Sequence, residues 1–355
     1  MGQPGSVALT VEHDGDVQAI AFSPNSGRFA SGGGDSLLRV RAIGIGKPLD
    51  VPSSGFTSGI AFCPDGATFA VADFEQVFLR NAATGAVLWQ GPVEPGRSVN
   101  AVRFGPDATM LLASTDRTVL VINADGTERR RITVERPLIA DVDLSRDGTL
   151  VALAVDERHG GDHRNAGSAR VIDLATGEPR GVLTPDNAVM AVEFSPDGGS
   201  VLCCAADDTT RMFDAATGDQ LWPTPDEIDD QVTAPSCLAF DPKGRWAVIG
   251  GSDGFARILD ADAGVERGRA PKVPPGTPDP GFGAVTHVAF GPSGTLAASA
   301  SIDNVVRLFT LDGKERYAVD TGEVLAMAFS PDGRWLGLGC RGGAVVLDNG
   351  DPGAG

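Results

Sequence analysis

The sequence predicts an all-β fold: an eight-bladed β-propeller whose blades are four-stranded antiparallel sheets. An apolar phrase that ends in Ser-Pro-Asp-Gly, or in a close variant, occurs eight times in the 355 residues. Successive copies lie 39 to 50 residues apart, close to the ~40–45 residues of one propeller blade. The chain also contains 47 glycines and 24 prolines, which is typical of many tight turns. The anchor residues of the eight phrases are Phe22, Phe62, Phe104, Leu144, Phe194, Phe240, Phe290 and Phe329.

Each repeat divides into four short strands. The first, such as residues 17–22, is an apolar run without strict alternation, as expected for a strand that is buried on both faces. It ends where proline presets φ and glycine supplies a positive φ. The second is rich in small residues (29–34) and the third in β-branched ones (118–123). A turn such as Asp-Ala-Ala-Thr-Gly (214–218) leads into the fourth strand, for example 219–222. No segment has a capped 3.6-residue period, so no substantial helix is expected.

The eighth repeat lacks a fourth strand of its own. After 344–348 the chain offers only Asn-Gly-Asp-Pro-Gly-Ala-Gly, whereas residues 6–12 alternate apolar with small or polar side chains. We therefore expect a single propeller domain over residues 1–355, in which 6–12 completes the last blade and closes the ring. Such closure protects the sheet edges. Residues 349–355 are expected to form a flexible tail.

The repeats resemble the WD-repeat (WD40) β-propeller family over essentially the whole chain. The resemblance rests on the eight phrases and on seven aspartates at the turn between the second and third strands: Asp35, Asp73, Asp116, Asp156, Asp207, Asp253 and Asp303. The tryptophan of the family's Trp-Asp pair is absent, and the loop histidine survives only as His13. The His-Asp-Ser/Thr-Trp network is thus expected to be incomplete in every blade, with apolar packing joining the blades. The aspartates are expected to accept backbone N–H groups. The resemblance implies partner binding.

Two segments, 81–90 and 214–223, also resemble the tryptophan-docking repeat of eight-bladed quinoproteins. Those enzymes use pyrroloquinoline quinone, and some contain a disulfide between adjacent cysteines. Cys203 and Cys204 are adjacent here, but they fall in the middle of an expected strand. Only Trp89 and Trp222 occupy the docking position, where packing between blades is the favoured role. No cofactor is therefore expected.

Composition excludes several classes of partner. The net charge of −18 argues against nucleic acid and anionic membranes. No apolar stretch approaches the ~18 residues of a membrane span, and the N-terminus has no signal-peptide pattern. Five scattered cysteines in apolar segments indicate buried free thiols and a reducing cytoplasm. They are Cys63, Cys203, Cys204, Cys237 and Cys340.

Two function hypotheses remain. The first is a non-enzymatic scaffold that binds a protein partner or a small ligand, because no Gly-x-Ser-x-Gly, phosphate-loop, His-Glu-x-x-His or dinucleotide motif occurs in a supporting context. The alternative is an enzyme of specialised metabolism that binds a small molecule over the central pore. Polar first-strand residues are its pore-lining candidates, although they could equally line a water-filled channel: Arg103, Asp141, Asp143, Glu193 and His287.

The lengths of the loops predict which face of the molecule binds a partner or ligand. Length variation is concentrated in 157–168, 223–234 and 268–284, all expected on one face. The first holds two histidines in a His-x3-His pattern, but two glycines disfavour the helix that would align them, and we predict no metal. The second is an acidic run, either a solvated loop or a docking patch for a basic partner. The binding candidates are His159, Asp162, His163, Arg164, Asp226, Glu227, Asp229, Asp230 and Phe282.

Overall fold

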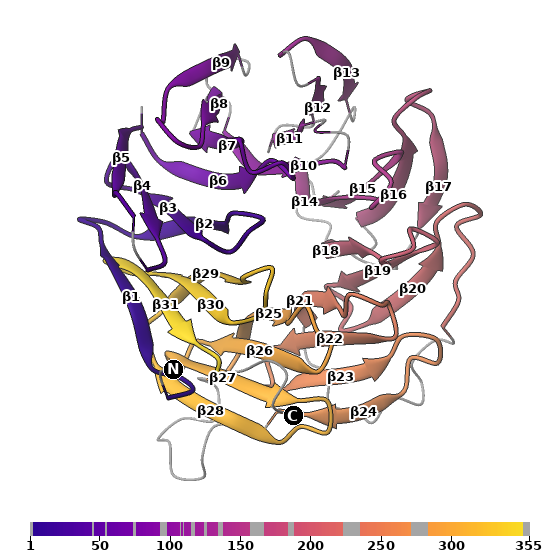
Figure 1. Ribbon diagram of the computed structural model, residues 1–355. Coiled ribbons are helices and arrows are strands. Elements are labelled where there is room, and N and C mark those ends of the chain that lie inside the picture. The colour runs from indigo at the N-terminus through magenta and orange to yellow at the C-terminus, as the bar shows by residue number, and fades with distance from the viewer. Residues whose placement is uncertain are drawn as a thin grey trace, which may run out of the picture. The chain divides into compact units, whose positions relative to one another are not determined.

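The repeat in the sequence is a repeat of antiparallel sheets in the structure (Figure 1). The computed structural model describes residues 3–44, 46–53, 55–73, 76–92, 98–106, 108, 110–114, 118–123, 126–133, 138–156, 167–183, 188–222, 235–270 and 283–350. These ranges form 31 strands in eight sheets and contain no helix. Nothing in them therefore resembles a membrane-spanning helix. We number the sheets 1 to 8 along the chain by the strand that carries the repeated apolar phrase, so that sheet 1 contains β2 and sheet 8 contains β29.

The first compact unit comprises residues 1–133 and 322–355 and contains sheets 8, 1, 2 and 3. Sheet 1 consists of β2 (Val17–Phe22), β3 (Arg28–Gly33), β4 (Leu37–Ala42) and β5 (Leu49–Pro52). Sheet 2 consists of β6 (Thr57–Phe62), β7 (Thr68–Asp73), β8 (Gln76–Asn81) and β9 (Val87–Pro92). Sheet 3 consists of β10 (Val99–Phe104), β11 (Met110–Ser114), β12 (Thr118–Ile122) and β13 (Glu128–Thr133). Sheet 8 has the order β1 (Val7–Glu12), β31 (Gly343–Asp348), β30 (Trp335–Cys340) and β29 (Val324–Phe329).

The second unit comprises residues 134–321 and contains sheets 4 to 7. Sheet 4 consists of β14 (Leu138–Leu144), β15 (Leu150–Asp156), β16 (Gly167–Asp173) and β17 (Pro179–Leu183). Sheet 5 has three strands: β18 (Val189–Phe194), β19 (Ser200–Ala205) and β20 (Thr210–Asp214). Sheet 6 consists of β21 (Pro235–Phe240), β22 (Trp246–Gly251), β23 (Ala256–Asp260) and β24 (Glu266–Arg269). Sheet 7 consists of β25 (Val285–Phe290), β26 (Leu296–Ser301), β27 (Val305–Thr310) and β28 (Glu315–Asp320).

The fourth strand predicted at 219–222 does not form, which corrects the sequence-based prediction for sheet 5. A single bridge joins Phe213 to Gln220, and the N–H of Leu221 donates to the carbonyl of Met212 at 2.7 Å. The indole of Trp222 is then 3% exposed and donates to the Ala261 carbonyl of sheet 6. Residues 219–222 therefore form one bridge with β20 and then bury the Trp222 ring against sheet 6, instead of continuing as a fourth strand.

The predicted contribution of the N-terminus to the last sheet is confirmed. β1 pairs antiparallel with β31, with Thr10 opposite Val345. The side chain of Val11, 2% exposed, packs in a cluster that includes Val17 of sheet 1 and Val346 of β31. Asn349, at the start of the expected tail, is buried, and its side-chain amide donates to the Gly333 carbonyl at 3.1 Å. Residues 351–355 lie outside the described residues.

The second strands form the core of each unit. All six residues of β26 are buried, and so are five of the six in β3 and in β19. The small side chains of these strands let neighbouring sheets approach closely on both faces, and each buried large apolar side chain contributes roughly 1.5–3 kcal/mol. The turns before them adopt the predicted conformation, with a positive φ at Gly198 (75°) and at Gly333 (74°).

The anchoring of β1 can be tested with two valines of the same strand. Val11→Ala is expected to lower the free energy of unfolding by about 2 kcal/mol, because it leaves a cavity in a buried cluster. Val7→Ala removes the same atoms from a side chain that is 56% exposed and should change stability by less than ~0.5 kcal/mol. Urea unfolding of the two variants measures the difference. Equal effects would contradict the anchoring.

Candidate functional site

The nine loop candidates lie outside the described residues, so their placement stays a prediction. They are His159, Asp162, His163, Arg164, Asp226, Glu227, Asp229, Asp230 and Phe282. The structure does correct the bounds of two variable segments. β16 begins at Gly167 and β24 extends to Arg269, so the variable stretches are 157–166 and 270–284 rather than 157–168 and 268–284. Among the described side chains, no group of three His, Cys, Asp or Glu is placed to hold a metal ion.

Two polar first-strand candidates of β14 bind the main chain of the next sheet. Asp141 Oδ2 accepts the N–H of Val192 at 3.1 Å, and Asp143 Oδ2 accepts the N–H of Phe194 at 2.9 Å. The neighbouring N–H, that of Ser195, faces β19 and donates to Ser200. Because successive N–H groups in a strand face opposite sides, that of Phe194 faces away from its own sheet. The Asp143 carboxylate therefore satisfies a donor that sheet 5 leaves unpaired.

Glu193 repeats this arrangement one sheet later. Its Oε1 accepts the N–H of Phe240, on β21, at 3.2 Å. Sheet 6 carries Ala239 at the position of Asp143 and Glu193, as sheets 1 and 2 carry Ala21 and Ala61. The three carboxylates thus connect sheets 4, 5 and 6 in series. We assign them to holding adjacent sheets together.

The other two first-strand candidates make contacts with neighbouring residues of their own strands. Arg103 is exposed in the first unit, where its Nη1 donates to the Val102 carbonyl at 3.2 Å. His287 is half-buried in the second unit, with Nδ1 3.0 Å from the Thr286 hydroxyl. The five candidates are thus divided between the two units, with Arg103 in the first and the other four in the second.

Four of the aspartates in the turns before the third strands share two kinds of contact. In four turns, one carboxylate oxygen accepts the N–H two residues later, as predicted; the pairs are Asp35–Leu37, Asp207–Thr209, Asp253–Phe255 and Asp303–Val305. The other oxygen pairs with an arginine four residues later, which the sequence analysis missed. These ion pairs are Asp35–Arg39 (2.5 Å), Asp207–Arg211 (3.0 Å), Asp253–Arg257 and Asp303–Arg307 (2.9 Å). The Asp-x3-Arg spacing was the signal that could have revealed them.

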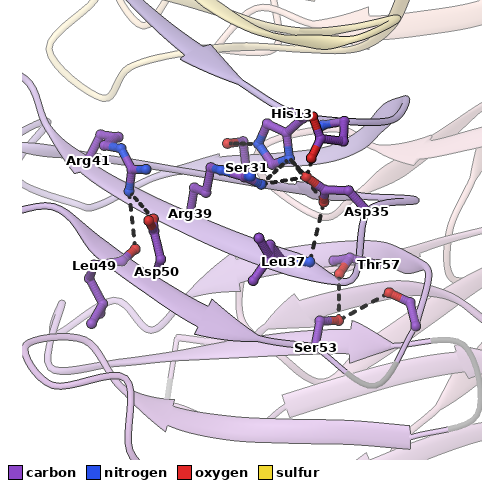
Figure 2. A network of polar contacts seen from close by, with 12 residues as sticks. His13, Ser31, Asp35, Leu37, Arg39, Arg41, Leu49, Asp50, Ser53 and Thr57 are labelled. Atoms are coloured by element: carbon purple, nitrogen blue, oxygen red, sulfur yellow. Dashed lines mark hydrogen bonds and ion pairs between the residues drawn. The ribbon is translucent and has the colours of Figure 1, made fainter.

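In sheet 1 this ion pair is extended by the loop histidine (Figure 2). His13 Nε2 lies 2.9 Å from Ser31 Oγ, and Nδ1 lies 2.8 Å from Arg39 Nη1 and 3.1 Å from Asp35 Oδ2. As predicted, the network lacks its tryptophan, but its other three members, His, Asp and Ser, are joined here, with Arg39 as a fourth. Arg41, at the family's tryptophan position, instead pairs with Asp50 of β5 at 2.5 Å.

Burial fixes the charge state of this network. Burial of the imidazole lowers the pKa of His13 below its ordinary 6.5. Burial alone would raise the pKa of Asp35, but hydrogen bonds from Arg39 and His13 hold it below its ordinary value. At neutral pH the ring is therefore neutral, with Nδ1 facing the Asp35–Arg39 ion pair and Nε2 facing the Ser31 hydroxyl. Ser31 is fully buried, so this His–Ser pair cannot meet a substrate and has a structural role.

The two tryptophans pack between sheets, as predicted. Trp222 Nε1 donates to the Ala261 carbonyl at 2.8 Å, and its ring lies against Gly264 (φ 69°). The ring of Trp89 lies in the same way against Gly126 (φ 84°) of sheet 3. A Cβ at either glycine would collide with the ring, so the glycine is needed for both its positive φ and its lack of a side chain.

The cysteines do not fit the quinoprotein resemblance. All five are free thiols. Cys203 and Cys204 lie side by side in β19, where successive side chains point to opposite faces, and both are buried. Burial raises the pKa of Cys203 and Cys204 and raises that of Cys237 to about 12. The disulfide between adjacent cysteines that some quinoproteins contain is therefore not formed here.

The bridging role of Asp143 predicts a graded effect on stability. Asp143→Ala is expected to cost about 1–3 kcal/mol, because the N–H of Phe194 is left without its acceptor. Asp143→Asn keeps an acceptor oxygen and should cost less. Urea unfolding of both variants orders them, and a wild-type midpoint for Asp143→Ala would refute the bridge.

Two protein-family models match parts of this chain. Residues 13–180 match the PQQ-type family model described as outer membrane protein assembly factor BamB. Residues 177–214, 229–260 and 278–310 match the WD domain, G-beta repeat. None of the curated proteins matches.

Three solved structures illustrate the similarity of fold. Sqt1 from Chaetomium thermophilum, bound to the N-terminus of the ribosomal protein L10, has a TM-score of 0.80 at 18% identity, covering 97% of this chain and 100% of that one. The C-terminal WD40 domain of Sif2 has a TM-score of 0.77 at 14% identity, with coverages of 99% and 100%. The computationally designed Ika8 protein has 0.79 at 20%, with coverages of 97% and 100%. The chain therefore carries WD40 repeats beside a BamB-like PQQ-type propeller segment, and its fold is that of a β-propeller.

Proposed function

We propose that this protein is an interaction scaffold that binds a protein partner, or a small ligand, through the face that carries its variable loops. The proposal rests on one observation: the polar side chains described above stabilise the sheets and their contacts. The described first-strand carboxylates bind the main chain of the next sheet, and the His13 network is buried. The chemistry-bearing groups of the described sheets thus hold the scaffold together. Sqt1, similar in fold, is seen with the N-terminus of a ribosomal protein, which supports a protein as the partner.

We further propose that the scaffold is an eight-bladed ring closed by β1. Eight first strands lie in eight sheets, and β1 supplies the outer strand of the last. The alternative, a propeller enzyme acting over a central pore, has less support, because Asp141, Asp143 and Glu193 already accept backbone N–H groups.

The proposal can be tested by loop replacement. Gly-Ser links in place of 157–166 and 271–282 should abolish capture of the partner from native lysate, while the melting temperature stays near that of the wild type, because loops on a rigid scaffold carry binding. The control is the double variant Arg146→Ser, Lys243→Ser, which changes two exposed residues in the short turns that follow first strands. It should capture the same proteins as the wild type. Equal capture by the loop variant, or turnover of a small molecule without any captured protein, would contradict the scaffold.

We also propose a reducing, cytoplasmic setting. The support is the burial of four of the five free cysteines and the raised thiol pKa values, which make the thiolate scarce. Titration of free thiols in the unfolded protein, isolated without reductant, should give about five per chain. A value of three or one would mean disulfides and an oxidising compartment.

A further inference from the structure

β9 is the outer strand of sheet 2 in the first unit (Figure 1). One of its edges pairs with β8, with Trp89 opposite Leu79, and no strand of the described chain pairs with the other edge. Alternate N–H and C=O groups of a strand point away from its partner. β9 therefore presents main-chain donors and acceptors outward, and an edge of this kind is a template for another strand.

The other described outer strands carry charged residues, which hinder the approach of a further strand. Glu12 lies in β1, Asp50 in β5 and Arg180 in β17, and β13, β24 and β28 carry at least three charges each. β9 reads Val-Leu-Trp-Gln-Gly-Pro and carries none. The preceding turn, residues 81–86, is also free of charge. β9 is thus the one described outer strand without this protection.

The side chains of β9 are apolar or neutral where they meet solvent. Val87 is 47% exposed and Leu88 is 54% exposed. The next exposed residue is Gln90, whose Nε2 donates to Gln76 Oε1 of β8 at 2.5 Å. Apolar side chains beside an unpaired edge favour contact with a second apolar strand, because both surfaces leave water.

Packing holds β9 in place for such pairing. The Trp89 ring lies against Gly126 of sheet 3 and belongs to the apolar cluster that sheets 2 and 3 share. Pro92, which has no N–H, is the last residue of the strand, so residues 87–91 all keep their donors. Because the edge is ordered before a second strand arrives, pairing costs less conformational entropy.

We propose that β9 is a self-association edge, which pairs antiparallel with β9 of a second copy of this chain across a two-fold axis. Charge favours this occupant. Each copy has a net charge of −18, so two copies repel each other, and the repulsion is weakest where the facing surfaces carry no charge. An apolar, uncharged strand is also complementary to itself, as a two-fold interface requires.

The contact is small, so the association is weak and depends on concentration. Six residues from each copy bury far less than the ~1,600 Å² of a standard interface. Salt strengthens the association, because it screens the repulsion between the two acidic copies while the contact itself contains no ion pair to weaken. A contact made of ion pairs responds to salt in the opposite direction.

Sedimentation velocity of the full chain tests the pairing, at concentrations up to roughly 500 µM because interfaces of this size are weak. The wild type should pass from monomer to dimer as its concentration rises. The midpoint should move to lower concentration when NaCl is raised from about 50 to 500 mM. A wild type that stays monomeric, as it would if a strand of another protein were the true occupant, overturns the proposal. So does a dimer that salt weakens.

Two variants of equal charge assign the contact to β9. Leu88→Glu places a carboxylate on the edge and should weaken dimerisation at least about tenfold, because the two copies then oppose like charges. Val265→Glu adds the same charge beside the charged strand β24, at a side chain that is 51% exposed, and should dimerise like the wild type. Both side chains are exposed, so both variants should melt near the wild-type temperature. Wild-type dimerisation by Leu88→Glu would refute the edge.

Amide hydrogen exchange locates the contact without any substitution. Protection of a peptide covering residues 87–92 should rise with the concentration of the wild type, because main-chain N–H groups of β9 become hydrogen-bonded in the dimer. Protection of residues 266–269, in β24, should stay constant. A dimer that leaves the exchange of β9 unchanged would place the interface elsewhere and overturn the proposal.

Discussion

The second strand of each sheet has apolar or small residues on both faces, so each sheet needs a neighbour on either side. β26 is buried along its whole length, which one sheet alone could not achieve. The remaining contacts between sheets follow from this requirement. When two sheets pack face to face, the N–H groups at the edge of a first strand and the glycines of the turns lie close to side chains of the adjacent sheet. Carboxylates can then accept those N–H groups, and a tryptophan ring can pack on a glycine.

One set of polar contacts between sheets depends on a single position in the first strand. Where that position is alanine, as at Ala239, no carboxylate is available for such a bridge. Where it is Asp143 or Glu193, a carboxylate also bridges to the main chain of the next strand. The aspartates of the turns act differently, because their arginine partners belong to the same sheet. Some acidic residues thus stabilise one sheet internally, and others join it to the next.

Much of the fold could be predicted because its determinants are local. Each of these features depends on residues that are close together in the sequence: the turn glycines, the N–H groups bound by turn aspartates and the alternating pattern of β1. Other features depend on which strands become neighbours. The partner of Asp143 is 51 residues away in sequence, and no spacing rule points to it. Residues 219–222 look like a strand, but burial of Trp222 diverts them. The loop candidates depend on variable segments that have no repeat from which to extrapolate.

The carboxylate bridges recognise a backbone group and no particular side chain. Every residue except proline supplies an N–H at the receiving position, so the bridge from Asp143 sets no requirement on the side chain there. The Asp-x3-Arg ion pair is likewise independent of the neighbouring sheet, since both of its members lie within one sheet. As far as these two contacts are concerned, such a sheet can be copied, deleted or moved without a matching change in its neighbour, whereas the Trp222 ring needs Gly264 next to it. Such tolerance fits a chain in which BamB-like and WD40-like repeats stand side by side.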